Sequence, residues 1–228
     1  MTGGLDPLID IRAALAPHGI FLRGQVDFGE KGVGPLLPDG ERAKTVVLLG
    51  NIGGSLWPAF ERWHGRHPVT DPLDNWSKAI IRPVAEAAGA VAFFPSDPPW
   101  QPFQQWAMRA EGLKASPLGI LIHPQYGLWH GYRGALAFRQ ALAPASVFCA
   151  APHPCDVCET KPCLKNCPVS AVAAQAFDVG ACRAHLATVA GQAGCMQAGC
   201  LARDACPVGA EYRYPAAQLR FHMAALSL

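Results

Sequence analysis

Eight of the nine cysteines fall into two groups of four, and each group ends in a Cys-Pro dipeptide. The first group has the spacing Cys-x2-Cys-x4-Cys-x3-Cys-Pro and comprises Cys155, Cys158, Cys163 and Cys167. The second group has the spacing Cys-x12-Cys-x4-Cys-x5-Cys-Pro and comprises Cys182, Cys195, Cys200 and Cys206. Thiols in such groups pair with one another or converge on a shared metal centre, so this pattern constrains the fold of the C-terminal third.

Three interpretations compete for these cysteines: disulfides, structural zinc and iron–sulfur clusters. Disulfides suit a short secreted chain, whereas this chain has 228 residues and opens without the cationic segment and apolar core of a secretion signal. Structural zinc favours two close cysteine pairs, and only Cys155-x2-Cys158 has that form. Three close cysteines followed by a fourth before proline are typical of two-cluster ferredoxins. The pattern therefore favours two [4Fe–4S] clusters, with zinc and disulfides as the alternatives.

In the two-cluster arrangement the fourth cysteine of each group binds the other cluster. The first cluster is then expected to take Cys206 from the second group, and the second cluster to take Cys167 from the first. The predicted ligand sets are Cys155, Cys158, Cys163 and Cys206 for one cluster, and Cys182, Cys195, Cys200 and Cys167 for the other. Both spacings are looser than the usual bacterial run. The ninth cysteine, Cys149, ends an apolar stretch and is predicted to be a buried, inert thiol.

Composition narrows the classes of protein that the chain can represent. Half of the residues are hydrophobic, which is enough for one large domain or two small ones. Charged residues make up 16%, the net charge is +2, and no basic run indicates a nucleic-acid surface. No stretch approaches the roughly 18 apolar residues that a membrane-spanning helix needs. We expect a cytoplasmic protein that binds neither tRNA nor a membrane.

Hydrophobic patterning predicts an alternation of helices and strands before the cysteine motifs. Helices are expected at 8–19, 71–89 and 102–112, and strands at 20–28, 44–50, 90–95, 118–124 and 145–149. Further helices are expected at 178–191 and 215–226. This order indicates an α/β or α+β layer at 1–150 followed by a small, mostly helical domain at 151–228.

The segment EGLKASPLGILIHPQYGLWHGYRGAL at 111–136, followed by a strand and two cluster motifs, resembles the epoxyqueuosine reductases. Reductive dehalogenases and cobalamin-trafficking chaperones are relatives of that family. The resemblance implies a nitroreductase-like α+β domain that holds cobalamin, followed by a ferredoxin-like domain with two [4Fe–4S] clusters.

The chain also departs from this family in three places. The family's Gly-Lys-Asn turn is replaced by the residues 116–119, which removes a cationic contact. The family's Asp-x-x-Pro aspartate, which is taken to protonate the substrate, aligns with Ser96 when Pro99 is matched, and Asp97 follows one residue later. The family also carries a C-terminal helical-repeat region that helps to hold tRNA, and we do not expect a counterpart in this chain, which stops at Leu228. A tRNA substrate is therefore not expected.

The resemblance suggests that the turn IHPQYGLWHG faces the corrin, with Gly127 allowing close approach and Tyr126 and Trp129 offering apolar faces. Ordinary core packing is the alternative. His123 and His130 are candidate cobalt ligands or satisfied structural histidines. Asp97 is a candidate general acid or a turn-forming aspartate.

These features together predict an iron–sulfur, cobalamin-dependent reductase. Its clusters would pass electrons to a corrinoid that reduces a small molecule or loses its own upper ligand. An electron-transfer protein with a partner-docking domain and a cobalamin-processing chaperone are the alternatives. The expected partners are a low-potential electron donor (a ferredoxin, a flavodoxin or a reductase) and a small-molecule substrate or corrinoid.

Overall fold

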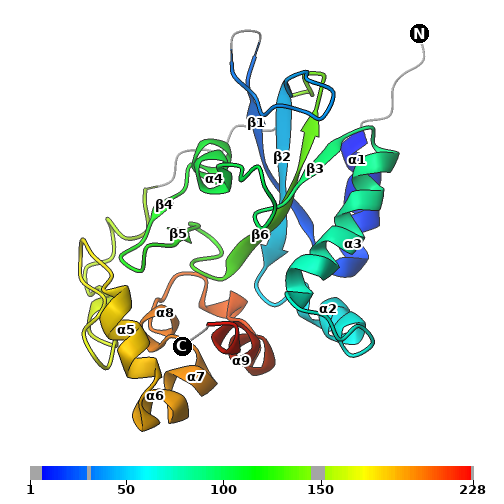
Figure 1. Ribbon diagram of the computed structural model, residues 1–228. Coiled ribbons are helices and arrows are strands. Elements are labelled where there is room, and N and C mark those ends of the chain that lie inside the picture. Colours follow the sequence, from blue (N-terminus) through cyan, green and yellow to red (C-terminus); the bar gives the residue numbers. More distant parts are fainter. Residues whose placement is uncertain (1–6, 30–31, 145–151, 227–228) are drawn as a thin grey trace. The chain divides into compact units, whose positions relative to one another are not determined.

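The computed structural model describes residues 7–29, 32–144 and 152–226 (Figure 1). The described chain divides into two compact units, which we call the first unit (7–112 with 131–144) and the second unit (113–130 with 152–226). The predicted domain ranges 1–150 and 151–228 differ from these units at the segment 113–130, whose Leu118, Ile122 and Leu128 share an apolar core with Cys206. The predicted strand at 145–149 and Cys149 lie outside the described residues.

The first unit contains a four-stranded sheet of order β1-β2-β6-β3, in which β1 pairs antiparallel with β2 and β3 pairs antiparallel with β6. The strands are β1 (Phe21–Asp27), β2 (Thr45–Ile52), β3 (Val91–Phe93) and β6 (His130–Phe138). β2 is buried along almost its entire length, as its continuously apolar sequence predicts. Antiparallel pairing with separate helices confirms the mixed α+β class. The finer assignments, nitroreductase-like and ferredoxin-like, stay predictions.

The helices of the first unit are α1 (Pro7–Leu15), the 3-10 turn η1 (Ala16–His18), α2 (Trp57–His64), α3 (Pro72–Ala87) and α4 (Phe103–Glu111). α1 and α3 lie side by side along the sheet, and α4 packs on β1 away from them (Figure 1). Gly19 ends η1 with a φ of +65°, and a Cβ at this position would lie 2.0 Å from the Ser55 carbonyl oxygen. The predicted helix end at Gly19 therefore has both a conformational and a packing cause.

A buried ion pair joins three elements of the first unit. The Arg23 guanidinium of β1 donates to the Glu111 carboxylate of α4 at 3.0 and 3.2 Å, and both side chains are almost fully buried. The Tyr132 hydroxyl of β6 donates to the same carboxylate. Burial, and then the neighbouring negative charge of Glu111, raises the pKa of Tyr132 above its ordinary value. The network is satisfied on all sides, as a buried charge pair requires.

The second unit is built from short elements. They are β4 (Lys114–Ala115), β5 (Leu121–Ile122), η2 (Pro162–Leu164), α5 (Val179–Leu186), α6 (Val189–Ala193), α7 (Cys195–Ala198), α8 (Leu201–Asp204), η3 (Ala210–Tyr212) and α9 (Ala216–Ala224). A small apolar core that includes Leu118, Ile122, Val172 and Ala202 lies at its centre, and most of the cysteines pack against it.

Four elements differ from the sequence prediction. The predicted strand 118–124 is only the two-residue β5, which pairs with β4 outside the main sheet. The predicted helix 178–191 is two helices, because the Thr188 hydroxyl accepts from the Gly191 N–H and starts α6. Pro83 predicts a kink or a split in the helix at 71–89, whereas α3 continues through Pro83 without splitting. The central strand β6 was not predicted.

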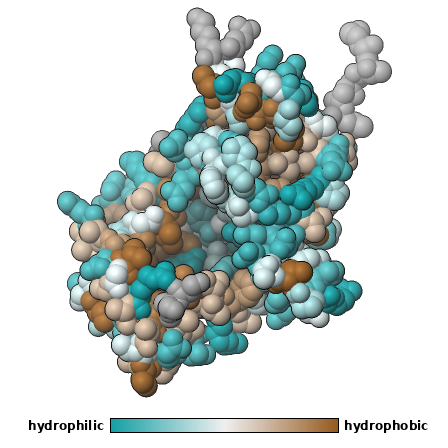
Figure 2. Space-filling model, in the orientation of Figure 1, coloured by the Kyte–Doolittle hydropathy of each residue, from teal (hydrophilic) through white to brown (hydrophobic). Residues whose placement is uncertain are grey.

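The visible face of the molecule mixes hydrophilic and hydrophobic residues (Figure 2). Large apolar side chains that are exposed include Val33, Trp100, Val157 and Val189. Among the described helices, none has both the length and the apolar character to cross a membrane.

Candidate functional site

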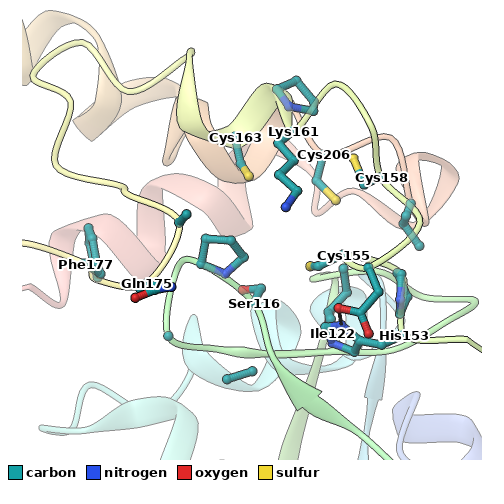
Figure 3. Close-up of a pocket in the computed structure, with 18 of the residues that line it drawn as sticks. Ser116, Ile122, His153, Cys155, Cys158, Lys161, Cys163, Gln175, Phe177 and Cys206 are labelled. Atoms are coloured by element: carbon teal, nitrogen blue, oxygen red, sulfur yellow. Dashed lines mark ion pairs between the residues drawn. The ribbon is translucent and has the colours of Figure 1, made fainter.

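A cavity of about 410 Å³ in the second unit, which we call the first cavity, is lined by four thiols. The lining cysteines are Cys155, Cys158, Cys163 and Cys206. Cys155 and Cys158 come from the loop before η2, Cys163 lies in η2, and Cys206 follows α8. Figure 3 shows the four sulfurs facing the same space, which the turn between β4 and β5 closes from the opposite side.

The other four described cysteines line a second cavity of about 30 Å³. They are Cys167, Cys182, Cys195 and Cys200. Cys182 lies in α5, Cys195 begins α7, and Cys200 immediately precedes α8. The Cys167 sulfur accepts a hydrogen bond from the Ala171 N–H at 3.2 Å. The remaining lining is mostly apolar and includes Val169, Val172, Phe177, Leu186, Leu201 and Met223.

The structure thus brings together the two sets that the crossover arrangement predicts. Cys206 lies with the first motif and Cys167 with the second, although each belongs to the other motif in sequence. All eight described cysteines carry free thiols. Four thiols around one space match the donor set of a [4Fe–4S] cluster. Binding of iron and sulfide by these sets stays a prediction.

In both sets, burial and the neighbouring sulfurs disfavour the ionised form of the thiols. Burial, and then the neighbouring sulfurs of Cys206, Cys163 and Cys158, raises the pKa of Cys155 to about 11. Burial and the sulfurs of its own set likewise raise the pKa of Cys182. A cationic centre would reverse this balance, because it stabilises the thiolates that otherwise repel one another. The sets therefore fit an iron centre chemically.

Among the described residues, no three or more His, Cys, Asp or Glu side chains are arranged so that they could hold a metal ion. Each quartet instead surrounds a cavity.

Polar side chains surround the first cavity as well. The Lys161 ammonium points into it (Figure 3), and the backbone at Lys161 has a φ of +40°. Left-handed backbone in a lysine costs about 1–2 kcal/mol, so surrounding contacts hold it there. Ser116 and Gln175 face the same space from two other segments, and His153 pairs with Asp156 at 3.7 Å.

The turn predicted to face a corrin is held together by its own contacts. His123 is 2% exposed, and its Nδ1 accepts from the backbone N–H groups of Gln125 and Tyr126 at 3.0 and 3.1 Å. The rings of His123 and Tyr126 stack with centroids 4.2 Å apart. His130 Nε2 lies 3.2 Å from the Leu121 carbonyl oxygen. Both histidines therefore have structural partners.

Gly127 packs against the second unit's own backbone. Its φ is +57°, and a Cβ there would lie 1.9 Å from the Val208 carbonyl oxygen. Trp129 is 1% exposed, with the Arg203 guanidinium 4.2 Å from its ring and the Tyr214 ring edge-on. These contacts explain a glycine at 127 and a tryptophan at 129 without a ligand. A corrin-facing role for the turn stays a prediction.

Asp97 pairs with Lys78 at 2.5 Å and with Arg82 at 3.4 Å. Burial raises the pKa of Asp97, but the hydrogen bond and charge of Lys78, together with Ser96 and Arg82, outweigh it, so the pKa is lowered. A general acid must carry its proton at the working pH. The ion pairs therefore favour a structural role for Asp97 over the role of a general acid.

No known family model matches the chain, and no curated protein matches it. Among solved structures it is similar to CblC, a B12-trafficking protein of C. elegans and a homologue of human MMACHC. The two are 14% identical, with a TM-score of 0.53 over 95% of this chain and 91% of that chain. This likeness shows a shared fold. The sequence resemblance implies several groups of relatives. The solved structure that shares this fold belongs to one of them, the cobalamin-trafficking proteins.

Sequence reasoning missed two residues that the cavities single out. Lys161 directly precedes Pro162 and Cys163, and its place inside the first motif was the available signal. Phe177 lies between the two motifs and lines both cavities. An isolated aromatic residue in an alanine-rich segment gives no spacing signal, so Phe177 was not singled out.

Proposed function

We propose that the protein is a cobalamin-processing protein with reductive capacity, in which two [4Fe–4S] clusters pass electrons to a corrinoid substrate. The observation that carries the proposal is the sorting of eight cysteines into two sets of four around separate cavities. The fold shared with a B12-trafficking protein over 95% of this chain supports a corrinoid as the substrate.

The chain's own residues would hold the clusters in the two cavities. Cys155, Cys158, Cys163 and Cys206 would ligate the first cluster, and Cys182, Cys195, Cys200 and Cys167 the second. The hydrogen bond from the Ala171 N–H to the Cys167 sulfur would remain available to tune the second cluster. When bound, such clusters supply one-electron transfer at potentials that charge, hydrogen bonds and exposure to solvent determine.

Processing of a corrinoid calls for reduction because the bond from cobalt to its upper ligand weakens as cobalt gains electrons. Electrons would enter from an external low-potential donor such as a ferredoxin, a flavodoxin or a reductase. This donor would have to resupply every electron that a bound cluster gives up. In this proposal the corrinoid itself is the substrate, so no second small molecule has to be reduced.

Anaerobic purification followed by cobalamin addition tests the proposal. We expect about eight iron and eight sulfide per chain, as two cubane clusters require. Added hydroxocobalamin should bind, and its visible bands should change above the broad cluster absorbance. Clusters without cobalamin binding would instead favour an electron-transfer protein with a partner-docking domain. A chain that assembles no clusters would contradict the reductive half of the proposal.

A further inference from the structure

A backbone hairpin at 171–178 lies between the two cavities of the second unit. The Ala173 N–H donates to the Ala176 carbonyl and the Asp178 N–H to the Ala171 carbonyl, each at 2.8 Å. Val172 and Phe177 form an antiparallel bridge between these two hydrogen bonds. The Asp178 carboxylate then accepts from the Ala181 N–H at 2.8 Å and caps α5. The position of Phe177 is therefore fixed from both sides.

The tip and the base of this hairpin face different cavities. Ala174, Gln175 and Ala176 line the first cavity, whereas Val172 lines the second. Directly opposite residues of an antiparallel pair place their side chains on one face, so Phe177 lies beside Val172. Phe177 belongs to the lining of both cavities and packs against the apolar core. Its side chain therefore forms part of the wall between them.

The two spaces that this wall separates are unequal. The first cavity measures about 410 Å³ and carries Lys161, His153, Asp156 and Gln175 in its lining. The second measures about 30 Å³, and its lining besides the thiols is apolar except for His185. The second cavity therefore has much less room for water than the first. It is not sealed from solvent, because Val169 and Leu201 in its lining are 39% and 38% exposed.

We propose that Phe177 is a positioning residue that keeps the two clusters in unequal surroundings by closing the second cavity against the first. The first cluster is then the more accessible of the two to water and small solutes, and the second is the less accessible. Reduction adds negative charge to a cluster, and an apolar lining opposes that charge more than a polar one. The second cluster therefore has the lower reduction potential. This inference rests on the clusters of the proposed function.

Iron loss to a bulky hydrophilic iron chelator tests the inference on the reconstituted full chain under anaerobic conditions. The wild-type protein should release its iron in two phases of equal size. Cys182→Ser, which removes a ligand of the second cluster, should lack the slow phase. Phe177→Ala should accelerate the slow phase roughly tenfold or more, because deleting a packed ring leaves an opening that water can enter.

Three further variants test whether Phe177 acts by closing the second cavity or only by contributing to packing in general. Phe177→Leu should restore most of the slow rate, because it keeps an apolar side chain in the wall. Val172→Ala, on the same face of the hairpin, should accelerate the slow phase less than Phe177→Ala does. Phe221→Ala is the matched control, because Phe221 lies on α9 and lines neither cavity. It should leave both phases unchanged.

A potentiometric titration followed by electron paramagnetic resonance gives an independent readout. Phe177→Ala should raise the midpoint potential of the second cluster towards that of the first and leave the first unchanged. A single phase of iron loss in the wild type, or an unchanged slow phase and potential in Phe177→Ala, would overturn the inference while leaving the proposed function intact. A wild-type chain that holds no iron would overturn both.

Discussion

The two units of this protein are stabilised in different ways. The first unit has a sheet with the eight-residue β2, the sixteen-residue α3 and a core that contains fully buried Phe60, Trp76 and Phe138. The second unit has helices of four to nine residues, and cysteines form part of its core. From this difference we expect that apolar burial suffices to stabilise the first unit, whereas the second unit gains stability from a group bound by its cysteines.

Physical chemistry supports this contrast. Isolated helices shorter than about 12–15 residues are marginal in water, so the helices of the second unit gain stability only from their packing. Much of that packing is against thiols whose pKa values are raised by burial and by one another. When a site does not exist in the unfolded chain, the free energy of metal binding becomes free energy of folding.

Removal of iron is the strongest way to test this difference. Anaerobic chelation should unfold the second unit and leave the first folded, because only the second loses its bridging centres. Hydrogen exchange followed by mass spectrometry should show lost protection at 152–226 and retained protection in β2. Equal protection of both regions before and after chelation would contradict the comparison.

Gly127→Val should destabilise the second unit by about 3–5 kcal/mol, because left-handed backbone is strained in valine and its Cβ would clash with the Val208 carbonyl. Thermal and denaturant unfolding of the cluster-loaded protein measures this loss. Gly119→Val is the control: its φ is +76°, but nothing lies within 4 Å of the point that a Cβ would occupy. It should cost only the backbone strain, about 1–2 kcal/mol. Equal losses would show that the contact with Val208 contributes nothing.

Tyr132→Phe should destabilise the first unit by about 1.5–3 kcal/mol at neutral pH, the usual value of a hydrogen bond to a charged group. The folded pKa of Tyr132 is raised above its ordinary value of 10.0, so the neutral phenol's contribution is present below about pH 10 and lost as the pH rises further. The wild type and the variant should therefore converge in stability above pH 10. Urea unfolding at several pH values measures this, and a constant difference would contradict the assignment.

Asp97→Asn should have the smallest effect, less than about 1 kcal/mol, because the pair with Lys78 is partly exposed to solvent. The folded pKa of Asp97 is lowered, so this contribution is present above its ordinary pKa of 3.8 and lost as the pH falls below it. Urea unfolding at neutral and acidic pH measures it. Slower corrinoid turnover by about 100-fold or more in the variant would instead restore the general-acid interpretation.

Local signals in the sequence predicted much of the first unit. The end of α1 and η1 at Gly19 and the buried β2 follow from a positive-φ glycine and a continuous apolar run. β6 was missed because Gly131 and Gly134 weaken its strand signal. Gly134 is explained by distant contacts, because a Cβ there would lie close to Ile81 and to Phe93 of β3. The Gly131 carbonyl in turn explains the glycine at position 50, where a Cβ would lie 2.1 Å from it.

In the candidate site, the spacing of the motifs predicted which cysteines lie together, because a shared centre requires convergence. The packing roles of Gly127 and Phe177 could not be predicted from the sequence. Gly127 meets Val208 some eighty residues later, and Phe177 gains its place from two cavities formed by both motifs. Such positions are set by long-range packing, which local pattern does not encode.

The central claim is that the clusters pass electrons to a bound corrinoid. The most direct test is to reduce the cluster-loaded protein, remove the reductant and add hydroxocobalamin without oxygen. We predict that cluster reoxidation and cobalt reduction occur in equal electron amounts, at a rate that saturates with cobalamin concentration as a bound complex requires. A rate that rises linearly without saturation, or reduced clusters that persist beside unreduced cobalamin, would contradict the account.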